Sequence, residues 1–283
     1  MNIRKNVLPR RLVDWLCFLT IGIFLPIIFI FEMVIVLPAF HEPGGFFHTF
    51  TLLMGIFLVF NIKGNMIACM MVDTSVNYMH LQPPTEPIEL EKWIHCATCD
   101  KLAPPRSWHC KSCGVCILKR DHHCLFMGCC IGHYNHRYFL CFIVYLFLGA
   151  LYALVYNSIY IWILNGAVFS RWLTALKLIC PMLMLVSGPF SSNMYLLFYS
   201  LNVLALLYPT LLLGYMGPLV LGGRVCHERG KTFKYNYGIW QNLRNIFGQR
   251  IFAVWLSPLI TSELTHDGIN WQTDLPKDAP KNK

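Results

Sequence analysis

Four long apolar stretches dominate the pattern of the chain. They run over residues 15–37, 47–72, 138–164 and 194–221. A helix needs about 20 apolar residues to cross the hydrocarbon core of a bilayer, so each stretch is long enough to be a transmembrane helix. A further apolar stretch, residues 172–190, contains Gly188 and Pro189 near its end. We expect it to form a re-entrant or lumenal helix rather than a fifth span.

Lysine and arginine lie on one side of these stretches. Residues 4–11 contain four of them and residues 224–250 contain six, whereas the loop 38–46 has none. Loops rich in Lys and Arg stay in the cytosol. The chain is therefore predicted to cross the membrane four times, with both termini in the cytosol.

The remaining segments give the expected organisation. A cytosolic N-terminal segment (1–14) precedes the first two spans (15–72). Residues 73–137 are polar with seven Lys or Arg, which predicts a cytosolic domain. The last two spans and the apolar segment between them occupy residues 138–222, and a cytosolic C-terminal region follows (223–283). Within it, the short apolar run 251–260 predicts an interfacial helix.

The overall composition agrees with this membrane assignment. Hydrophobic residues make up 56% of the 283 residues and charged residues only 13%. Soluble domains have about 45–50% apolar and about 25% charged residues. A soluble globular protein is therefore excluded.

Cysteine is concentrated in one short part of the chain. Of thirteen cysteines, eight lie between Cys96 and Cys130, interspersed with histidines. A secreted disulfide scaffold would spread its cysteines behind a cleavable signal, whereas Cys-x2-Cys pairs beside histidines are typical of zinc sites in a reducing compartment. We do not expect a nucleic-acid partner, because the domain is tethered between spans and lacks a recognition-helix pattern.

The number of possible ligands exceeds the need of two zinc ions. Two tetrahedral sites take eight ligands. Two histidines and six cysteines supply them, the cysteines being Cys96, Cys99, Cys110, Cys113, Cys116 and Cys130. Cys124 and Cys129 are left over. Cys124 directly follows Asp121, His122 and His123, so this tetrad offers a nucleophile, a base, an orienting carboxylate and a spare histidine for zinc.

These motifs resemble the cysteine-rich domain of the DHHC protein S-acyltransferases, or palmitoyltransferases. The resemblance rests on residues 105–110 (Pro-Arg-Ser-Trp-His-Cys), on the tetrad 121–124, and on Cys130-Ile131-Gly132 leading to Asn135 and Phe139. The arrangement of two spans before and two after the domain is also similar. The tail 267–273 is similar to that of a short member of the family, so the resemblance covers nearly the whole chain.

The resemblance implies a role for each residue of the motifs. The first zinc would be held by Cys96, Cys99, His109 and Cys116, and the second by Cys110, Cys113, His123 and Cys130. Both zinc ions would be structural. Cys124 would be the acylated nucleophile, His122 its base, and Asp121 the residue that orients His122. The phosphates of a fatty acyl-CoA, such as palmitoyl-CoA, would meet Arg106, Lys119 and Arg120.

The implied reaction consists of two thioester exchanges. Cys124 would take the acyl group from acyl-CoA and pass it to a cytosolic cysteine of a membrane-associated protein. The acyl chain would lie among the spans, in contact with the lipid bilayer, where Gly149 and Ala150 would leave room for longer chains. The expected location is the endoplasmic reticulum or the Golgi. The expected fold class is an all-α integral membrane protein with a cytosolic zinc-folded domain between its second and third spans.

The chain departs from the family pattern in several places. Phe126 stands where the family usually has tryptophan, and Cys129 where it usually has asparagine. The Thr-Thr-x-Glu motif after the last span is not recognisable, its nearest equivalent being residues 224–227. The alternative function is therefore a zinc-folded membrane scaffold with little or no transfer activity. The intact tetrad favours the enzyme.

Overall fold

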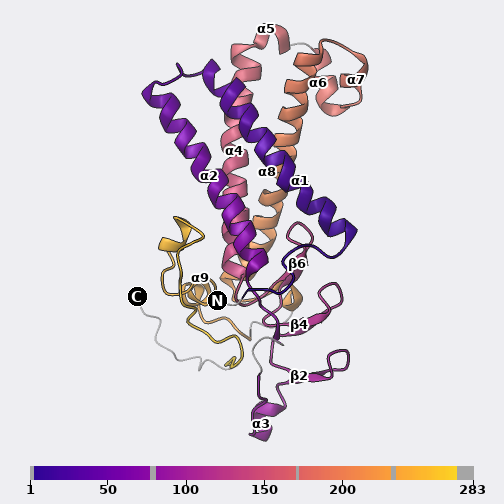
Figure 1. Ribbon diagram of the computed structural model, residues 1–283, viewed down its shortest axis with the longest axis vertical. Helices are drawn as coiled ribbons and strands as arrows, with labels where there is room; N and C mark the ends of the chain where they lie inside the picture. The colour runs from indigo at the N-terminus through magenta and orange to yellow at the C-terminus, as the bar shows by residue number, and fades with distance from the viewer. Residues whose placement is uncertain (1–2, 77–80, 170–171, 231–233, 273–283) are drawn as a thin grey trace. The chain divides into compact units, whose positions relative to one another are not determined.

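The structure, a computed structural model, describes residues 3–76, 81–169, 172–230 and 234–272 (Figure 1). These residues include four helices that are long and apolar enough to cross a membrane, as expected of a multi-pass membrane protein. They are α1 (Leu12–Phe31, continued by tighter and wider turns to Ala39), α2 (Phe46–Met71), α4 (His136–Ile159, continued to Leu164) and α8 (Phe190–Leu221). The described residues thus contain as many candidate spans as the sequence predicts, four. The predicted C-terminal region continues beyond the described residues after Gln272.

The segment between the last two spans is not one helix. It forms α5 (Gly166–Phe169), α6 (Trp172–Ile179) and α7 (Leu183–Val186) before α8 begins. Pro181 and Pro189 lack the amide hydrogen that a continuous helix needs, which explains both interruptions. The buried Lys177 ammonium donates hydrogen bonds to Ser187 O and Asn193 Oδ1, each at 2.8 Å, and thereby fixes this turn.

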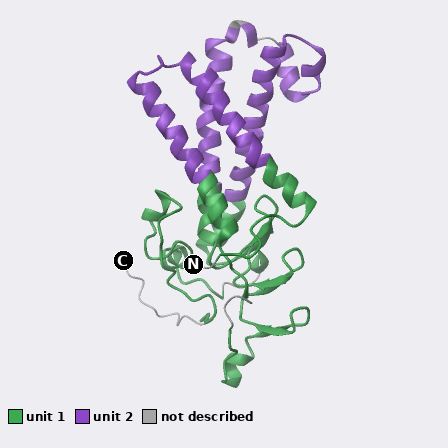
Figure 2. Ribbon diagram, viewed as in Figure 1, with its two compact units in different colours: residues 1–19, 63–142, 214–283 green, residues 20–62, 143–213 purple. Residues whose placement is uncertain are grey.

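The chain forms two compact units (Figure 2). Unit 1 contains residues 1–19, 63–142 and 214–283, and unit 2 contains residues 20–62 and 143–213. In unit 2, the Glu32 carboxylate accepts a hydrogen bond from Asn157, and Phe31 stacks on Phe198 with ring centroids 4.4 Å apart. A cavity of about 90 Å³ lies between α1, α2, α4 and α8, with mainly apolar walls.

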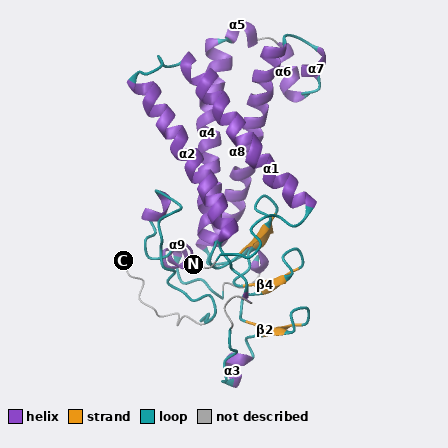
Figure 3. Cartoon of the chain, viewed as in Figure 1, coloured by secondary structure: helices purple, strands orange, loops and turns teal. Residues whose placement is uncertain are grey.

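Unit 1 contains three small β-hairpins, which the expected all-α fold did not include (Figure 3). Strand β1 (Ile94–Cys96) pairs with β2 (Lys101–Ala103), β3 (Trp108–Cys110) with β4 (Val115–Ile117), and β5 (His122–Cys124) with β6 (Cys129–Ile131). The short helix α3 (Pro87–Leu90) precedes them. Three-residue strands are not stable alone, because an isolated hairpin buries too little surface. The hairpins therefore need another source of stability.

The three hairpins are structural repeats. Their strand pairings are the same when the chain is shifted by 14 residues: His95 pairs with Leu102, His109 with Cys116, and His123 with Cys130. The turns repeat as well, since Asp100, Gly114 and Gly128 all have positive φ (48°, 70° and 57°). Each turn thus needs a left-handed residue at the same place, which glycine and aspartate tolerate best.

The C-terminal segment of unit 1 differs from the prediction for residues 251–260. The helix of this segment, α9 (Ile239–Phe247), ends before residue 251. The described residues 251–260 form a single 3-10 turn, Ala253–Trp255, instead of the predicted interfacial helix. Pro258 ends any helix before it, because its ring clashes with the preceding turn and it has no N–H. Exposed Phe252, Leu256 and Leu259 still give this segment an apolar surface.

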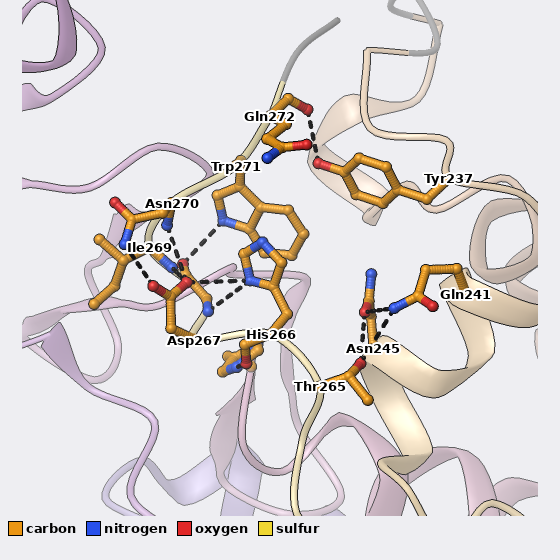
Figure 4. A network of polar contacts seen from close by, with 12 residues as sticks. Tyr237, Gln241, Asn245, Thr265, His266, Asp267, Ile269, Asn270, Trp271 and Gln272 are labelled. Atoms are coloured by element: carbon orange, nitrogen blue, oxygen red, sulfur yellow. Dashed lines mark hydrogen bonds and ion pairs between the residues drawn. The ribbon is translucent and has the colours of Figure 1, made fainter. Parts of the chain in front are cut away.

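A polar network holds the end of the described chain (Figure 4). Asn245 Oδ1 accepts hydrogen bonds from Gln241 at 2.9 Å and from Thr265 at 2.8 Å. The Asp267 carboxylate accepts from the backbone N–H groups of Ile269 and Asn270 and from the Asn270 side chain. His266 stacks on Trp271 with ring centroids 3.8 Å apart. These contacts order the tail whose motif the sequence singled out.

Candidate active site and metal centres

The first ligand set lies between the first two hairpins. Cys96 and Cys99 come from the first hairpin, and His109 and Cys116 from the second; their ligand atoms all lie within 4.8 Å of one another. His109 Nδ1 is 3.7 Å from Cys96 Sγ and 3.2 Å from Cys99 Sγ. Tetrahedral zinc with bonds of about 2.3 Å to sulfur and about 2.0 Å to nitrogen separates such atoms by about 3.5 Å. The group can therefore hold a metal ion such as zinc.

The second set repeats the first, one hairpin further on. Cys110 and Cys113 come from the second hairpin, and His123 and Cys130 from the third. The three sulfur atoms lie 3.4–3.8 Å from His123 Nδ1, again as a tetrahedral ion requires. Both groupings agree with those predicted from the sequence. They also supply the missing stability, because each metal ion would tie two successive hairpins together.

A buried carboxylate supports the second set. Asp14, 1% exposed in the first turn of α1, lies with Oδ2 3.4 Å from His123 Nε2. A carboxylate on the second nitrogen of a ligand histidine fixes the ring and raises its basicity. Asp14 was not predicted from the sequence. The available signal was a carboxylate at the start of an otherwise apolar helix.

Strand geometry separates the metal side from the reactive side of the last hairpin. Successive side chains of a strand point to opposite faces, so His122 and Cys124 share one face of β5 while His123 points to the other. His123 is paired across the hairpin with Cys130, its partner in the second set. Cys124 is paired with Cys129, whose buried thiol lies 3.9 Å from Cys69 O. Cys124 and His122 thus lie on the face of β5 opposite to His123.

The predicted base and orienting carboxylate are in contact. His122 Nδ1 lies 2.7 Å from Asp121 Oδ2. Burial alone would raise the pKa of Asp121, but the hydrogen bond from His122 and that from the backbone N–H of Cys226 hold it well below the usual range. Because Asp121 is ionised, Nδ1 must carry the proton, which leaves His122 Nε2 as the acceptor. Phe139 packs against the ring, edge to face, at 4.8 Å.

Cys124 needs this base. Its side chain is buried, and burial, together with the nearby Cys129, raises its pKa to about 12. At neutral pH the group is therefore a thiol, which is a poor nucleophile without proton transfer. His122, on the same strand face, is the candidate acceptor of that proton.

Asp121 is also held from the C-terminal segment. The Cys226 backbone N–H donates to Asp121 Oδ1 at 2.7 Å, and the Cys226 thiol donates to Oδ2 at 3.3 Å. Cys226 begins a short turn that ends at Glu228. Residues 225–228 (Val-Cys-His-Glu) place a glutamate where the Thr-Thr-x-Glu pattern has one, one position later than the stretch 224–227 named from the sequence. The pattern is hard to recognise in the sequence because Val225 and Cys226 stand at both threonine positions, so only the glutamate remains.

Arg106 has a structural role. Its guanidinium donates to Glu228 Oε1 at 2.8 Å, to Glu228 Oε2 at 2.6 Å and to Gly223 O at 2.8 Å. It lies between the rings of Tyr235 and Trp271, 4.3 Å from each centroid. We call this group, Arg106 with Glu228, Tyr235 and Trp271, the arginine clamp.

The arginine clamp corrects the prediction for the acyl-CoA contacts. Arg106 and Lys119 are each only 4% exposed, and Lys119 lies near the Trp271 ring. Burial lowers the pKa of Lys119 to about 7. Neither side chain is free to bind a phosphate from solvent. Arg120, which is half-buried and interacts with the thiols of Cys110 and Cys130, stays a prediction.

Comparison with known proteins gives the class of this chain. The family model described as DHHC palmitoyltransferase matches residues 89–223. Together with the similarity of relatives over most of their length, this shows that the chain belongs to the DHHC palmitoyltransferase family.

Several relatives with the name palmitoyltransferase match this chain. "Probable palmitoyltransferase ZDHHC24" of Mus musculus is 32% identical over 233 residues, which cover 78% of each chain. The protein of the same name from Danio rerio is 37% identical over 184 residues, 64% of this chain and 62% of that protein. "Palmitoyltransferase PFA4" of Mycosarcoma maydis is 37% identical over 210 residues, 69% of this chain and 42% of that protein. The match with the last two thus spans less than two thirds of their length.

Proposed function

We propose that this protein is a protein S-palmitoyltransferase in which Cys124 carries the acyl group. The observation that supports this most directly is the Asp121–His122 hydrogen bond of 2.7 Å beside a buried thiol on the same strand face. The family relationship supports the same chemistry. A scaffold without transfer activity has no need of an oriented histidine next to a free cysteine, so this alternative is not favoured.

The reaction takes place in two exchanges. His122 Nε2 accepts the Cys124 proton, and the thiolate attacks the thioester carbonyl of a fatty acyl-CoA. The carbon–sulfur bond to CoA breaks, and the CoA thiolate leaves with the proton from His122. The thiolate of an acceptor protein then attacks the Cys124 thioester in the same way. Each exchange replaces one thioester with another, so positioning contributes most of the rate.

The two ligand sets are proposed to hold structural zinc. Four thiolate or imidazole ligands in each set close the coordination sphere, which leaves no position for a substrate. Zinc bound there would supply the stability of the three hairpins. The site residues themselves perform the transfer, with Asp121 orienting His122 and His122 moving the proton.

The membrane part is proposed to bind the acyl chain. The apolar cavity in unit 2 is lined by Gly149 and Ala150, among others. A bulky residue such as Phe at position 150 is expected to shift the preference towards shorter acyl-CoA chains. An unchanged length profile would contradict this role. Cytosolic termini, residence in the endoplasmic reticulum or Golgi, and acceptor cysteines on membrane-associated proteins complete the proposal.

The first test is formation of the acyl-enzyme. The full chain in detergent is incubated with labelled palmitoyl-CoA, and hydroxylamine-sensitive label is compared between wild type, Cys124→Ser and Cys180→Ser. Cys180 is an exposed cysteine in unit 2 and serves as the control. We expect label on wild type and on Cys180→Ser, and none on Cys124→Ser. A folded, zinc-loaded wild type without label would contradict the enzyme and favour the scaffold.

A further inference from the structure

A third group of metal-ligand side chains lies at the active site itself. One ligand atom each from Asp121, His122 and Cys226 lies within 4.8 Å of the other two. Asp121 Oδ2 is 2.7 Å from His122 Nδ1 and 3.3 Å from Cys226 Sγ. None of these residues belongs to the two structural sets, and no role was predicted for Cys226 from the sequence.

The surrounding fold holds this group in place. The backbone N–H of Cys226 donates a hydrogen bond to Asp121. The Glu228 carboxylate, two residues later, accepts hydrogen bonds from Arg106 and from the backbone N–H of Val225. His227 packs on Trp108 with ring centroids 4.1 Å apart. The thiol therefore keeps its position without a ligand. Since side chains of a metal site must otherwise be ordered on binding, such preorganisation favours affinity.

The Asp121–His122–Cys226 group is accessible from solvent. Close to it lies a buried imidazole, that of His136, which could also offer a nitrogen to a metal ion. The His122 side chain is 29% exposed, and Cys226 is half-buried. His136 interacts electrostatically with Asp121, is fully buried, and neither of its ring nitrogens has a hydrogen-bond partner among the described residues. An imidazole left unpaired in such a place is unusual, because buried polar groups are normally hydrogen-bonded.

We propose that Asp121, His122 and Cys226 form a third, inhibitory site for a thiophilic divalent cation, of which zinc is the representative. A thiolate, an imidazole nitrogen and a carboxylate oxygen are ligands that zinc accepts, and hard cations such as magnesium do not favour this set. On binding, the Cys226 thiol loses its proton to solvent and a sulfur–zinc bond replaces its hydrogen bond to Asp121. The site keeps a fourth position open to water.

Binding would switch off the base. A neutral imidazole carries one ring proton, which is on Nδ1 while that atom donates to Asp121. When Nδ1 instead binds the ion, the proton moves through solvent to Nε2. His122 Nε2 then has no lone pair to accept the Cys124 proton, so acyl transfer stops although the ion touches neither the thiol nor the thioester. This inference of inhibition rests on the proposed function, whereas ion binding does not.

Binding is tested first, without any acyl transfer. The full chain is dialysed against zinc buffers of increasing free concentration, and bound zinc per chain is measured by mass spectrometry of the metal. Cys226→Thr is the matched variant, because a threonine hydroxyl can still donate to Asp121 but is a poor zinc ligand. We expect wild type to bind three zinc ions, the third more weakly, and Cys226→Thr to bind two. Two ions on both proteins over the whole range would overturn the site.

Inhibition is tested second. The initial rate of Cys124 acylation is measured in the same zinc buffers, with magnesium as the comparison ion and Cys180→Ser as the control for an unrelated free thiol. Wild type and Cys180→Ser are expected to share one inhibition curve, and Cys226→Thr to need at least ten-fold more free zinc. Equal curves for wild type and Cys226→Thr, or inhibition by magnesium, would overturn the inhibitory role. If Cys226→Thr is inactive, the number of zinc ions bound per chain decides: three on wild type and two on Cys226→Thr support the site, and equal numbers overturn it.

Discussion

The second and third hairpins have the same architecture but different chemistry. Both have the same strand register, and both turn at a glycine with positive φ. The second hairpin contributes ligands to both metal sets, His109 and Cys116 to the first and Cys110 and Cys113 to the second. The third contributes ligands to one set only, through His123 and Cys130.

The difference explains the origin of the proposed nucleophile. Cys124 occupies the position of Cys110 in the repeat, and the partner cysteine of the pair, Cys113, is replaced by the buried Met127. A fourth hairpin would have to supply the next histidine and cysteine, but α4 begins instead. Cys124 is thus a metal-ligand position without a metal. The same repeat that stabilises the domain leaves a free thiol at its end.

The largest difference between the two hairpins is expected in metal content and stability, when the equivalent residues Cys110 and Cys124 are each replaced by serine. Removing a ligand thiolate should release the second ion and unfold the hairpins, because structural zinc contributes about 10–16 kcal/mol of apparent binding energy in small zinc domains. Cys124→Ser, at the equivalent position, should keep two ions per chain and the wild-type melting temperature. Metal analysis and thermal melting check this. Equal metal loss in both variants would mean that Cys124 is a ligand after all.

The next largest effect is expected on the rate of Cys124 acylation, from the residue that precedes the first strand of a hairpin: Asp121 in the third hairpin and Ser107 in the second. Asp121→Asn should slow acylation of Cys124 by about 10²- to 10⁴-fold, because an amide fails to hold the proton of His122 on Nδ1. Ser107 is the equivalent residue in the second hairpin, and its buried hydroxyl has no hydrogen-bond partner among the described residues. Ser107→Ala is therefore the control and should acylate at the wild-type rate. Rapid-quench labelling measures both rates, and an unaffected Asp121→Asn would exclude the orienting role.

A smaller, graded effect is expected with pH. Without its base, Cys124 depends on its own ionisation, and its pKa of about 12 lies above the assay range. The acylation rate of His122→Ala should therefore rise about ten-fold per pH unit between pH 7 and 9, since the thiolate fraction rises by that factor. The measurement is the initial rate of thioester formation at each pH. A flat profile would show that another group removes the proton.

The smallest effect is expected at the turns. A Cβ at Gly114 would meet nothing within 4 Å, whereas one at Gly128 would lie 2.7–2.8 Å from atoms of Pro9. Gly114→Ala should cost about 1–2 kcal/mol through its positive φ alone. Gly128→Ala should cost about 1–3 kcal/mol more through overpacking. Denaturation in detergent compares the two, and equal losses would mean that Pro9 moves aside freely.

The sequence was sufficient for the features that depend on local pattern. Apolar runs of more than 20 residues define spans by themselves, and the Cys-x2-Cys spacing brings each ligand pair to one turn. The three hairpins escaped prediction, because three-residue strands are too short to show an alternating pattern. In the proposed zinc sites, metal ligation rather than strand propensity would hold them together.

The features that depend on distant pairs could not be predicted. Asp121 and Cys226 are 105 residues apart, and no spacing rule connects them. Arg106 was assigned to phosphate binding because the phosphates of CoA would meet cytosolic arginines and lysines. Its burial depends on Glu228, Tyr235 and Trp271, more than 120 residues later. Only the folded chain shows that the charge of Arg106 is already neutralised.

The arginine clamp has a consequence for biosynthesis. The eight ligands of the two metal sets are all present once Cys130 has been translated, before the third span is made. Cys226, Glu228 and Trp271 are translated only after the fourth span. A nascent chain can thus load its metal early, but Asp121 gains its final partners only when the last part of unit 1 leaves the ribosome. Completion of the contacts of Asp121 is therefore coupled to synthesis of the fourth apolar helix.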